Sequence, residues 1–315
     1  MIRTFALTED AGGYLYDPAT GLTHRAVITP LVTGRVALPE SDALAGPALA
    51  TAGLSRNVPT SLCWSPIVRC NLACPHCLDD TTVIEAGMSE RRRIAGLLGQ
   101  AGVLGVDISG GEPLLLRELP DMALDVMATG RTAVSVTTNG WHLARRVSEL
   151  VGAIDAVRVS FDGADRHNHD RLRGPGSFSR AAEGVQAAVA AGLPVQIQTV
   201  LMRATAPQAQ AMVDLAAGLG AGGITFLQML PIGTGTAIAV ETALDDNTAE
   251  QIVGVLDVPD GFRLRLRTRG QAGGFTVVRA DGWVWRNNAD ATGIGGLHRL
   301  QHPGDLALAG VDGSA

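Results

Sequence analysis

Lysine is absent from this sequence of 315 residues, in which all 25 basic residues are arginines. This excludes chemistry that needs a lysine amine, such as Schiff-base formation or the anchoring of pyridoxal phosphate. Aromatic residues make up only 4% of the chain, which leaves few side chains to stack on nucleic-acid bases. The 31 acidic residues give a net charge of -6, which disfavours binding to a phosphate backbone. We therefore expect no nucleic-acid partner.

Long hydrophobic runs are also absent. No segment approaches about 18 uninterrupted apolar residues, the length that a membrane-spanning helix needs. The first residues lack the basic region and apolar stretch of a signal peptide. The chain has four cysteines, and they do not form the framework expected of a secreted disulfide-rich protein. These features predict a cytoplasmic protein with no membrane partner.

Cysteine is rare, yet three of the four stand together as Cys70, Cys74 and Cys77, in the pattern Cys-x3-Cys-x2-Cys. No cysteine follows them. Zinc sites usually have paired Cys-x2-4-Cys knuckles or a distant histidine pair, and His76 would have to crowd between Cys74 and Cys77 to act as a fourth ligand. A 4Fe-4S cluster normally takes four thiolates, so three would leave one iron with an open position. The pattern favours such a cluster; a zinc site and buried thiols are the alternatives.

The middle of the chain alternates short β-branched runs with longer alanine-rich amphipathic stretches, which is typical of repeated βα units and a parallel sheet. Six units predict an α/β fold, a partial (β/α)6 TIM-like barrel with its chemistry at the carboxyl ends of the strands. The expected strands are residues 61–68, 103–109, 132–138, 156–161, 194–201 and 223–229. The expected helices are one opened by Ser89 as N-cap and those over residues 116–129, 142–152, 178–191, 207–219 and 248–256.

Three regions follow from this pattern. Residues 1–58 form a small N-terminal segment, interpreted as β-rich and as a candidate for peptide recognition. Residues 59–231 form the barrel core. Residues 232–315 form a C-terminal α+β extension with a predicted hairpin, in which residues 275–279 and 283–286 flank Ala280, Asp281 and Gly282.

A Gly-Gly-Glu-Pro sequence, Gly110, Gly111, Glu112 and Pro113, ends the second predicted strand. Glycines let a backbone approach a ligand closely, and the carboxylate of Glu112 can accept hydrogen bonds from an ammonium group. Together with the three-cysteine loop, this sequence resembles the radical S-adenosylmethionine (radical SAM) superfamily over residues 58–230. The motifs at residues 69–77, 110–113, 138–140 and 160–163 resemble the branch of peptide-modifying, SPASM-type enzymes.

The resemblance implies a role for each matching residue. Cys70, Cys74 and Cys77 would hold three irons of one 4Fe-4S cluster, and S-adenosylmethionine would chelate the fourth. Glu112, with the backbone of Gly110 and Gly111, would receive the methionine ammonium. The remaining cofactor-binding candidates are His76 beside the adenine, Pro113 in the same turn, Thr138 and Asn139 at the rim, and Ser160 and Asp162 near the ribose and methionine. For the methionine carboxylate, the sequence does not choose among Arg171, Arg173 and Arg180.

The implied reaction is reductive cleavage of S-adenosylmethionine to a 5'-deoxyadenosyl radical that abstracts hydrogen from a substrate. It needs an external one-electron reductant such as a flavodoxin or ferredoxin. The C-terminal region resembles a SPASM or twitch extension but lacks the cysteines that bind auxiliary clusters. Cys63, on the first predicted strand, is a candidate hydrogen donor to a substrate radical, with a buried structural thiol as the alternative.

The leading hypothesis is therefore a radical SAM enzyme that matures a ribosomal peptide by epimerisation or cross-linking. Residues 4–21 are a candidate strand-pairing site for a leader peptide. Two alternatives stay open: a radical SAM enzyme that acts on a small molecule such as a sugar, nucleoside or amino acid, and a non-catalytic peptide-binding protein that carries the cluster.

Overall fold

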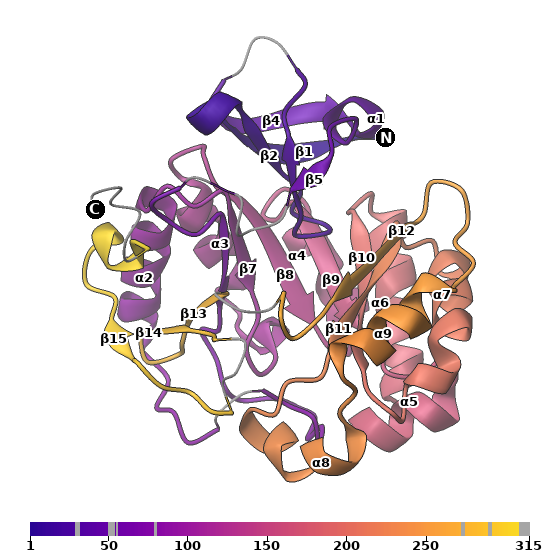
Figure 1. Cartoon of the computed structure of the whole chain (residues 1–315). Coiled ribbons are helices and arrows are strands. Elements are labelled where there is room, and N and C mark those ends of the chain that lie inside the picture. Colours follow the sequence, from indigo (N-terminus) through magenta and orange to yellow (C-terminus); the bar gives the residue numbers. More distant parts are fainter. Residues whose placement is uncertain are drawn as a thin grey trace, which may run out of the picture.

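The computed structural model describes residues 1–28, 32–49, 54, 56–78, 81–271, 275–288 and 292–308. Two sheets organise this part of the chain (Figure 1). The larger sheet has ten strands in the order β12-β11-β10-β9-β8-β7-β6-β13-β14-β15, and the smaller one has five in the order β4-β1-β2-β3-β5.

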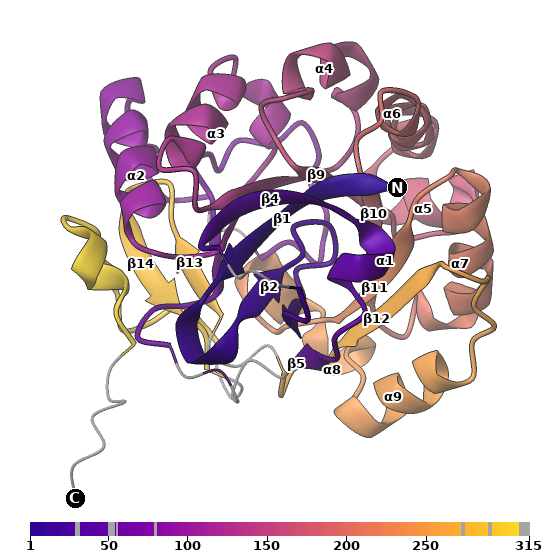
Figure 2. The ribbon, with the colours of Figure 1, turned by 90° about the horizontal axis from the view of Figure 1, so that it is seen from above.

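The six predicted βα strands are confirmed as one parallel run that curves without closing, so the fold is the predicted partial barrel (Figure 2). A seventh parallel strand, β12, continues the run beyond β11 and was not predicted. Its sequence alternates arginine with leucine, a pattern of period two that indicates a strand with one polar face. The seven strands are β6 (Ser61–Trp64), β7 (Gly105–Ile108), β8 (Ala133–Thr138), β9 (Ala156–Ser160), β10 (Val195–Leu201), β11 (Gly223–Gln228) and β12 (Arg263–Arg267).

Helices cover the outer face of the curved sheet (Figure 2). Alternate strand residues such as Val106, Val134 and Val157 point toward these helices and are fully buried in the main core. The other face of each strand lines the inside of the curve. The helices are α2 (Met88–Gln100), α3 (Leu119–Met127), α4 (Leu143–Leu150), α5 (Arg166–Arg173), α6 (Ser177–Ala190), α7 (Ala209–Gly218), α8 (Ala239–Thr242) and α9 (Asp246–Gly254).

Three of these helices differ from the prediction, among them the four-residue α8, which was not predicted. Helix α2 begins at Met88 with Gly87 as its N-cap, so Ser89 lies inside the first turn and is not the cap. Helix α5 was not predicted because its sequence is almost entirely polar and shows no apolar period. Its start is fixed instead by Asp165, whose side chain accepts a hydrogen bond from the Asn168 backbone NH (2.9 Å).

The N-terminal residues form an antiparallel sheet that covers the amino ends of the parallel strands, at the top of Figure 1. The Tyr16 ring packs so closely on Gly105, near the start of β7, that a Cβ there would lie 2.1 Å from a ring carbon. Arg158 of β9 donates from Nε to the Ala19 carbonyl (3.0 Å). The elements are β1 (Ile2–Thr8), β2 (Tyr14–Tyr16), β3 (Thr23–Arg25), β4 (Gly34–Pro39), α1 (Glu40–Ala43) and β5 (Ala48–Leu49).

This topology corrects one expectation about peptide binding. Strand β1 pairs with β2 on one side and β4 on the other, and β2 pairs with β1 and β3. Both strands within residues 4–21 are therefore interior, so neither offers an open edge for strand addition. Within the described residues, the edge strands of this sheet are β4 and β5.

The C-terminal hairpin is confirmed. Strands β13 (Thr276–Val278) and β14 (Trp283–Arg286) pair in antiparallel fashion, and β15 (His298–Arg299) pairs with β14. Because β13 also pairs in parallel with β6, the hairpin continues the large sheet. In the part of the chain that the structure describes, no helix is both long and apolar enough to cross a membrane.

Candidate functional site

The three-cysteine loop follows β6 at the carboxyl end of the parallel strands, and the glycines of the Gly-Gly-Glu-Pro turn hold its first part. Gly111 N donates to the Ile67 carbonyl (2.7 Å), and Glu112 N donates to the Arg69 carbonyl (2.9 Å). A Cβ on Gly111 would lie 2.3 Å from Arg69 O, and one on Gly110 would lie 2.3 Å from Ile67 O. The two glycines are therefore required for contact with the cysteine loop itself.

The turn after β11 supports the other end of the loop. Thr234 Oγ1 donates to the carbonyls of Cys74 (3.3 Å) and Cys77 (3.2 Å). Gly235 N donates to the same Cys77 carbonyl (3.3 Å). Gly233 has a φ of 62°, and a Cβ there would lie 2.6 Å from Cys77 O. Sequence analysis missed this support, because a turn that packs on another loop leaves no periodic signal.

The three thiols of the loop are free cysteines in the part of the chain that the structure describes. No disulfide involves Cys70, Cys74 or Cys77, and Cys70 is exposed. Burial raises the pKa of the Cys74 thiol, which is only partly exposed. Among the described residues, no three His, Cys, Asp or Glu side chains are grouped as ligands of a single metal ion.

Glu112 is fully buried beside this loop and accepts three hydrogen bonds. Oε1 accepts from Thr138 Oγ1 (2.7 Å) and Leu114 N (2.9 Å), and Oε2 accepts from Asn139 N (2.8 Å). Burial raises the pKa of Glu112, and no cationic side chain of the described residues forms an ion pair with it. Oε2 keeps acceptor capacity, so this carboxylate suits an ammonium ligand.

Asp162, beyond the end of β9, is fully buried among protein partners. Its Oδ2 accepts from Arg173 Nε (2.6 Å) and lies 2.9 Å from His76 Nε2, and its Oδ1 accepts from Val200 N (2.8 Å). Burial opposes ionisation, but the charge of Arg173 and then His76 outweigh it and hold the pKa of Asp162 well below its usual range. The expected contact of Asp162 with a ribose hydroxyl stays a prediction.

The structure distinguishes the three arginine candidates. Arg173 is buried against Asp162, and Cys74 and Cys77 lie close enough to help raise its pKa, although burial acts in the opposite direction. Arg171 is exposed, and Arg180 pairs with Glu183 on the surface (3.4 Å). Arg173 is thus the one candidate of the three that lies beside the cysteines.

The other predicted residues divide into positioning and unassigned groups. Thr138 orients Glu112, and Asn139 Nδ2 donates to Asn71 Oδ1 (2.9 Å) and approaches Cys70 Sγ (3.7 Å). Pro113 begins a 3₁₀ turn and is buried. Ser160 is partly buried at the end of β9, and His76 Nδ1 is buried with no hydrogen-bond partner in the described structure.

Cys63 is separate from the three-cysteine loop. It lies within β6, where its register partners are Asp107 of β7 and Val277 of β13, and it is partly exposed. Alternation with the buried Leu62 and Trp64 places it on the inner face of the curved sheet.

The comparisons with known proteins identify this region. Residues 64–216 match the family model of the radical SAM superfamily. This part of the chain is a radical SAM domain. Members of the superfamily use a 4Fe-4S cluster and S-adenosylmethionine, and the buried Glu112 and the three thiols of the radical SAM domain fit that pair of ligands.

Individual relatives of the radical SAM domain differ in what their names describe. The mycofactocin maturase MftC of Mycobacterium tuberculosis is 30% identical over 207 residues, covering 64% of this chain and 52% of the relative. A probable GTP 3',8-cyclase of Saccharolobus solfataricus is 29% identical over 144 residues, covering 45% and 47%. This chain thus spans about half the length of these relatives.

Among solved structures, Streptococcus suis SuiB bound to its precursor peptide SuiA superposes with a TM-score of 0.62 at 15% identity. The match covers 72% of this chain and 59% of SuiB. At this identity the similarity establishes the fold of the radical SAM domain and not its substrate.

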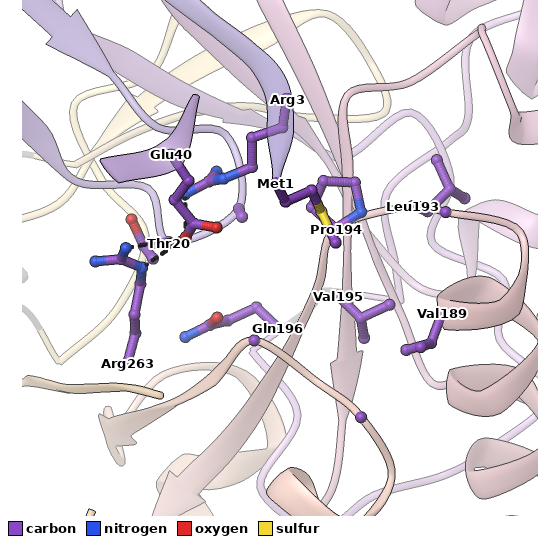
Figure 3. A pocket seen from close by; sticks show the side chains of 14 residues that line it. Met1, Arg3, Thr20, Glu40, Val189, Leu193, Pro194, Val195, Gln196 and Arg263 are labelled. Atoms are coloured by element: carbon purple, nitrogen blue, oxygen red, sulfur yellow. Dashed lines mark hydrogen bonds and ion pairs between the residues drawn. The ribbon is translucent and has the colours of Figure 1, made fainter. Parts of the chain in front are cut away.

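A separate pocket of about 110 Å³ lies at the opposite, amino end of the strands (Figure 3). It is lined by Met1, Arg3 and Glu40 of the N-terminal sheet and by residues near the starts of β10 and β12, including Gln196 and Arg263. Sites for small molecules typically enclose about 300–1,000 Å³, so this pocket is too small for S-adenosylmethionine. It does not belong to the radical SAM site.

Proposed function

We propose that this chain is a radical SAM enzyme that binds one 4Fe-4S cluster through Cys70, Cys74 and Cys77 and acts on a ribosomal peptide during its maturation. The observation that carries the cofactor assignment is the pairing of the three-thiol loop with the buried, cation-free carboxylate of Glu112, held by one Gly-Gly turn. When bound, the cluster and S-adenosylmethionine supply a 5'-deoxyadenosyl radical that takes a hydrogen atom from the substrate.

The residues of the chain then have distinct tasks. Glu112 binds the methionine ammonium, and Thr138 and Asn139 hold the Glu112 carboxylate in place. Arg173, fixed by Asp162, supplies positive charge beside the thiolates and is the candidate for the methionine carboxylate. Ser160, at the end of β9, and His76 are candidates for the ribose and adenine.

The outcome of the radical step depends on which electron acceptors and hydrogen donors the chain supplies. No cysteine follows Cys77, so the C-terminal region of this chain has no thiolate for an auxiliary cluster. We therefore favour epimerisation or another redox-neutral outcome, with Cys63 on the inner face as candidate hydrogen donor. Cross-linking needs an external electron acceptor.

The peptide substrate is supported by the two comparisons whose names concern peptides or maturation, MftC and SuiB. The similarity to a GTP 3',8-cyclase favours the second candidate, an enzyme that acts on a small molecule. An external one-electron reductant such as a flavodoxin or ferredoxin is part of either proposal.

Iron content tests the cluster site. Anaerobically reconstituted wild-type protein should carry about four iron atoms per chain, and Cys70→Ala should lose most of them. Cys63→Ala is the matched control, because it removes a cysteine outside the loop and should keep the iron. Equal iron content in Cys70→Ala and Cys63→Ala would refute the site.

Formation of 5'-deoxyadenosine tests the function. With S-adenosylmethionine and dithionite, product should form and should increase when the true substrate is added. A short peptide encoded beside the gene is the first substrate to try, and GTP is the small-molecule comparison. Stimulation by GTP alone would favour the second candidate, and an iron-loaded protein that forms no product with any substrate would favour a non-catalytic role.

A further inference from the structure

Strand β12 presents three arginines on one face. Leu264 and Leu266 pack against the core on the helix side of the sheet, so the alternating Arg263, Arg265 and Arg267 lie on the other, inner face. Figure 1 shows β12 at the edge of the curved sheet, below the N-terminal strands. The three arginines thus run from the N-terminal sheet toward the carboxyl end, where the cysteine loop lies.

The first two arginines have partners in the N-terminal sheet. Arg263 Nη2 lies 2.9 Å from Glu40 Oε1, and Arg265 Nη1 donates to the Thr20 carbonyl. Both contacts fasten the inner face of β12 to the sheet that closes the amino end. Arg263 thus has a carboxylate partner, and Arg265 has a neutral carbonyl acceptor.

Arg267 lies about 7 Å further along the strand and has no such partner. Its guanidinium makes no hydrogen bond or ion pair with any residue that the structure describes. The Arg267 residue as a whole is only partly buried. Its guanidinium lies over the Phe275 ring, whose centroid is 4.8 Å from Arg267 Cζ. Phe275 in turn packs edge-on against Trp285, which fixes the position of the guanidinium.

The surroundings of Arg267 are electropositive. Arg158 Nη1 pairs with Asp107 Oδ1 (3.1 Å), and Asp107 also accepts hydrogen bonds from Ser135 and Thr137. Neither Arg265 nor Arg267 has a carboxylate within ion-pair distance in the described structure. Burial, followed by the charge of Arg158, lowers the pKa of Arg267. An unneutralised charge in such a place is costly, and a bound anion would remove the cost.

The strand register places Arg267 at the level of the radical SAM site. Arg267 pairs with Leu227 of β11, and Leu227 pairs with Val200 of β10, whose backbone NH binds Asp162. Three strand spacings, about 14 Å along the curved sheet, separate Arg267 from Asp162. A group held by Arg267 would therefore face the cysteine loop across the inside of the curve.

We propose that Arg267 is a specificity-determining residue that binds a carboxylate of the substrate on the inner face of β12. A guanidinium held against Phe275 presents a fixed fork of donors, which matches a carboxylate. That the carboxylate belongs to the substrate rests on the proposed function. On a peptide it would be either an acidic side chain or the C-terminal carboxylate.

Three probes of nearly equal shape test the proposal on the full, anaerobically reconstituted chain by isothermal titration. N-acetylglutamate α-amide carries only a side-chain carboxylate, N-acetylglutamine carries only an α-carboxylate, and N-acetylglutamine amide carries neither. At least one charged probe should bind about tenfold more tightly than the neutral probe, and Arg267→Gln should abolish that preference. Arg267→Lys should restore part of it, and Arg131→Gln, at an exposed site, should keep it in full.

The result assigns the source of the carboxylate and separates this proposal from the proposed function. Preference for the first or the second probe identifies a side-chain or a terminal carboxylate. The proposal is overturned if all three probes bind equally, or if Arg267→Gln keeps the preference for a charged probe. It is also overturned if Arg267→Gln loses S-adenosylmethionine binding without any change in probe preference. Because the titration does not depend on 5'-deoxyadenosine formation, a protein that forms none can still show the preference, and the proposed function then fails alone.

Discussion

Glu112 illustrates how one buried side chain connects the fold to the cofactor. Its hydrogen bonds come from β8 and from its own turn, and they leave a negative charge without a cation in the interior. We expect Glu112→Gln to weaken S-adenosylmethionine binding by about 10- to 100-fold, because a charge-assisted hydrogen bond contributes about 1.5–3 kcal/mol. Equilibrium binding to the reconstituted protein measures this effect. Exposed Glu250→Gln serves as control.

The same residue predicts a pH dependence. Burial raises the pKa of Glu112, so as the pH falls the carboxylate takes up a proton earlier than an exposed glutamate would. A neutral carboxyl cannot pair with the methionine ammonium, and binding should therefore weaken as the pH is lowered from 7.5 toward 5.5. Glu112→Gln should show a flatter profile. Parallel profiles for the variant and the wild type would contradict the assignment.

The Gly-Gly turn acts through shape alone. In Gly111→Ala the new Cβ would meet the carbonyls of Arg69 and Val68 at 2.3 and 2.4 Å, so the cysteine loop must move. We expect the iron content after reconstitution to fall by at least half, although no metal ligand is changed. Gly96→Ala is the matched control, because nothing lies within 4 Å of its Cβ position in the middle of α2. It should keep its iron and gain about 0.5–1 kcal/mol of stability from helix propensity.

Helix α5 contacts the site through the ion pair of Arg173 with Asp162. Arg173, its last residue, pairs with Asp162, so Arg173→Gln removes the larger of the two positive charges beside a buried carboxylate. We expect a loss of about 3–5 kcal/mol in the free energy of unfolding at pH 7. Arg171→Gln, on the same helix but exposed, should change it by less than about 0.5 kcal/mol. Chemical denaturation measures both.

The pH dependence of this loss has a definite sign. The pKa of Asp162 is depressed in the folded protein, so its contribution to stability is present above the pKa of the unfolded chain and is lost as the pH falls toward the folded value. In Arg173→Gln the buried carboxyl is instead easier to protonate. The difference between variant and wild type should therefore be largest near neutral pH and shrink toward pH 4. A difference that does not vary with pH would contradict the ion-pair explanation.

The elements that the sequence predicts are those with a local or periodic pattern, and the elements that it misses lack one. The six βα units are visible because buried strands and amphipathic helices have distinct periods, and the cysteine and Gly-Gly-Glu-Pro motifs are local in sequence. Helix α5 and strand β12 lack a continuous apolar pattern. The choice of Arg173 and the support from Thr234 depend on contacts between loops that are distant in the chain, so only the folded structure reveals them.

In the whole molecule, the N-terminal sheet closes one end of the barrel. Ala19 and Thr20 supply carbonyl acceptors for the buried Arg158 and Arg265, and Tyr16 fills the space above Gly105. Burial and neighbouring arginines already lower the pKa of Arg265 to about 10. Removing residues 1–58 would therefore expose the apolar surface at the amino ends of the barrel strands. It would also leave the guanidiniums of Arg158 and Arg265 without these carbonyl acceptors.

This arrangement changes what deletion of residues 1–58 can show. If residues 1–58 were an independent recognition segment, their deletion would leave the thermal stability of the barrel unchanged. If they close the amino end of the barrel, their deletion should lower that stability. We expect the deletion variant to be insoluble or to melt at least about 10 °C lower, and the point variant Tyr16→Ala to lose about 3–5 kcal/mol, as large aromatic truncations in a core do. Thermal melting of the deletion variant and chemical denaturation of Tyr16→Ala measure these effects, with Val27→Ala, an exposed apolar position in the same region, as control. A deletion variant that keeps its melting temperature and its iron would show that the barrel folds without the N-terminal sheet. Loss of peptide binding in that variant would then be evidence that the N-terminal sheet recognises the peptide.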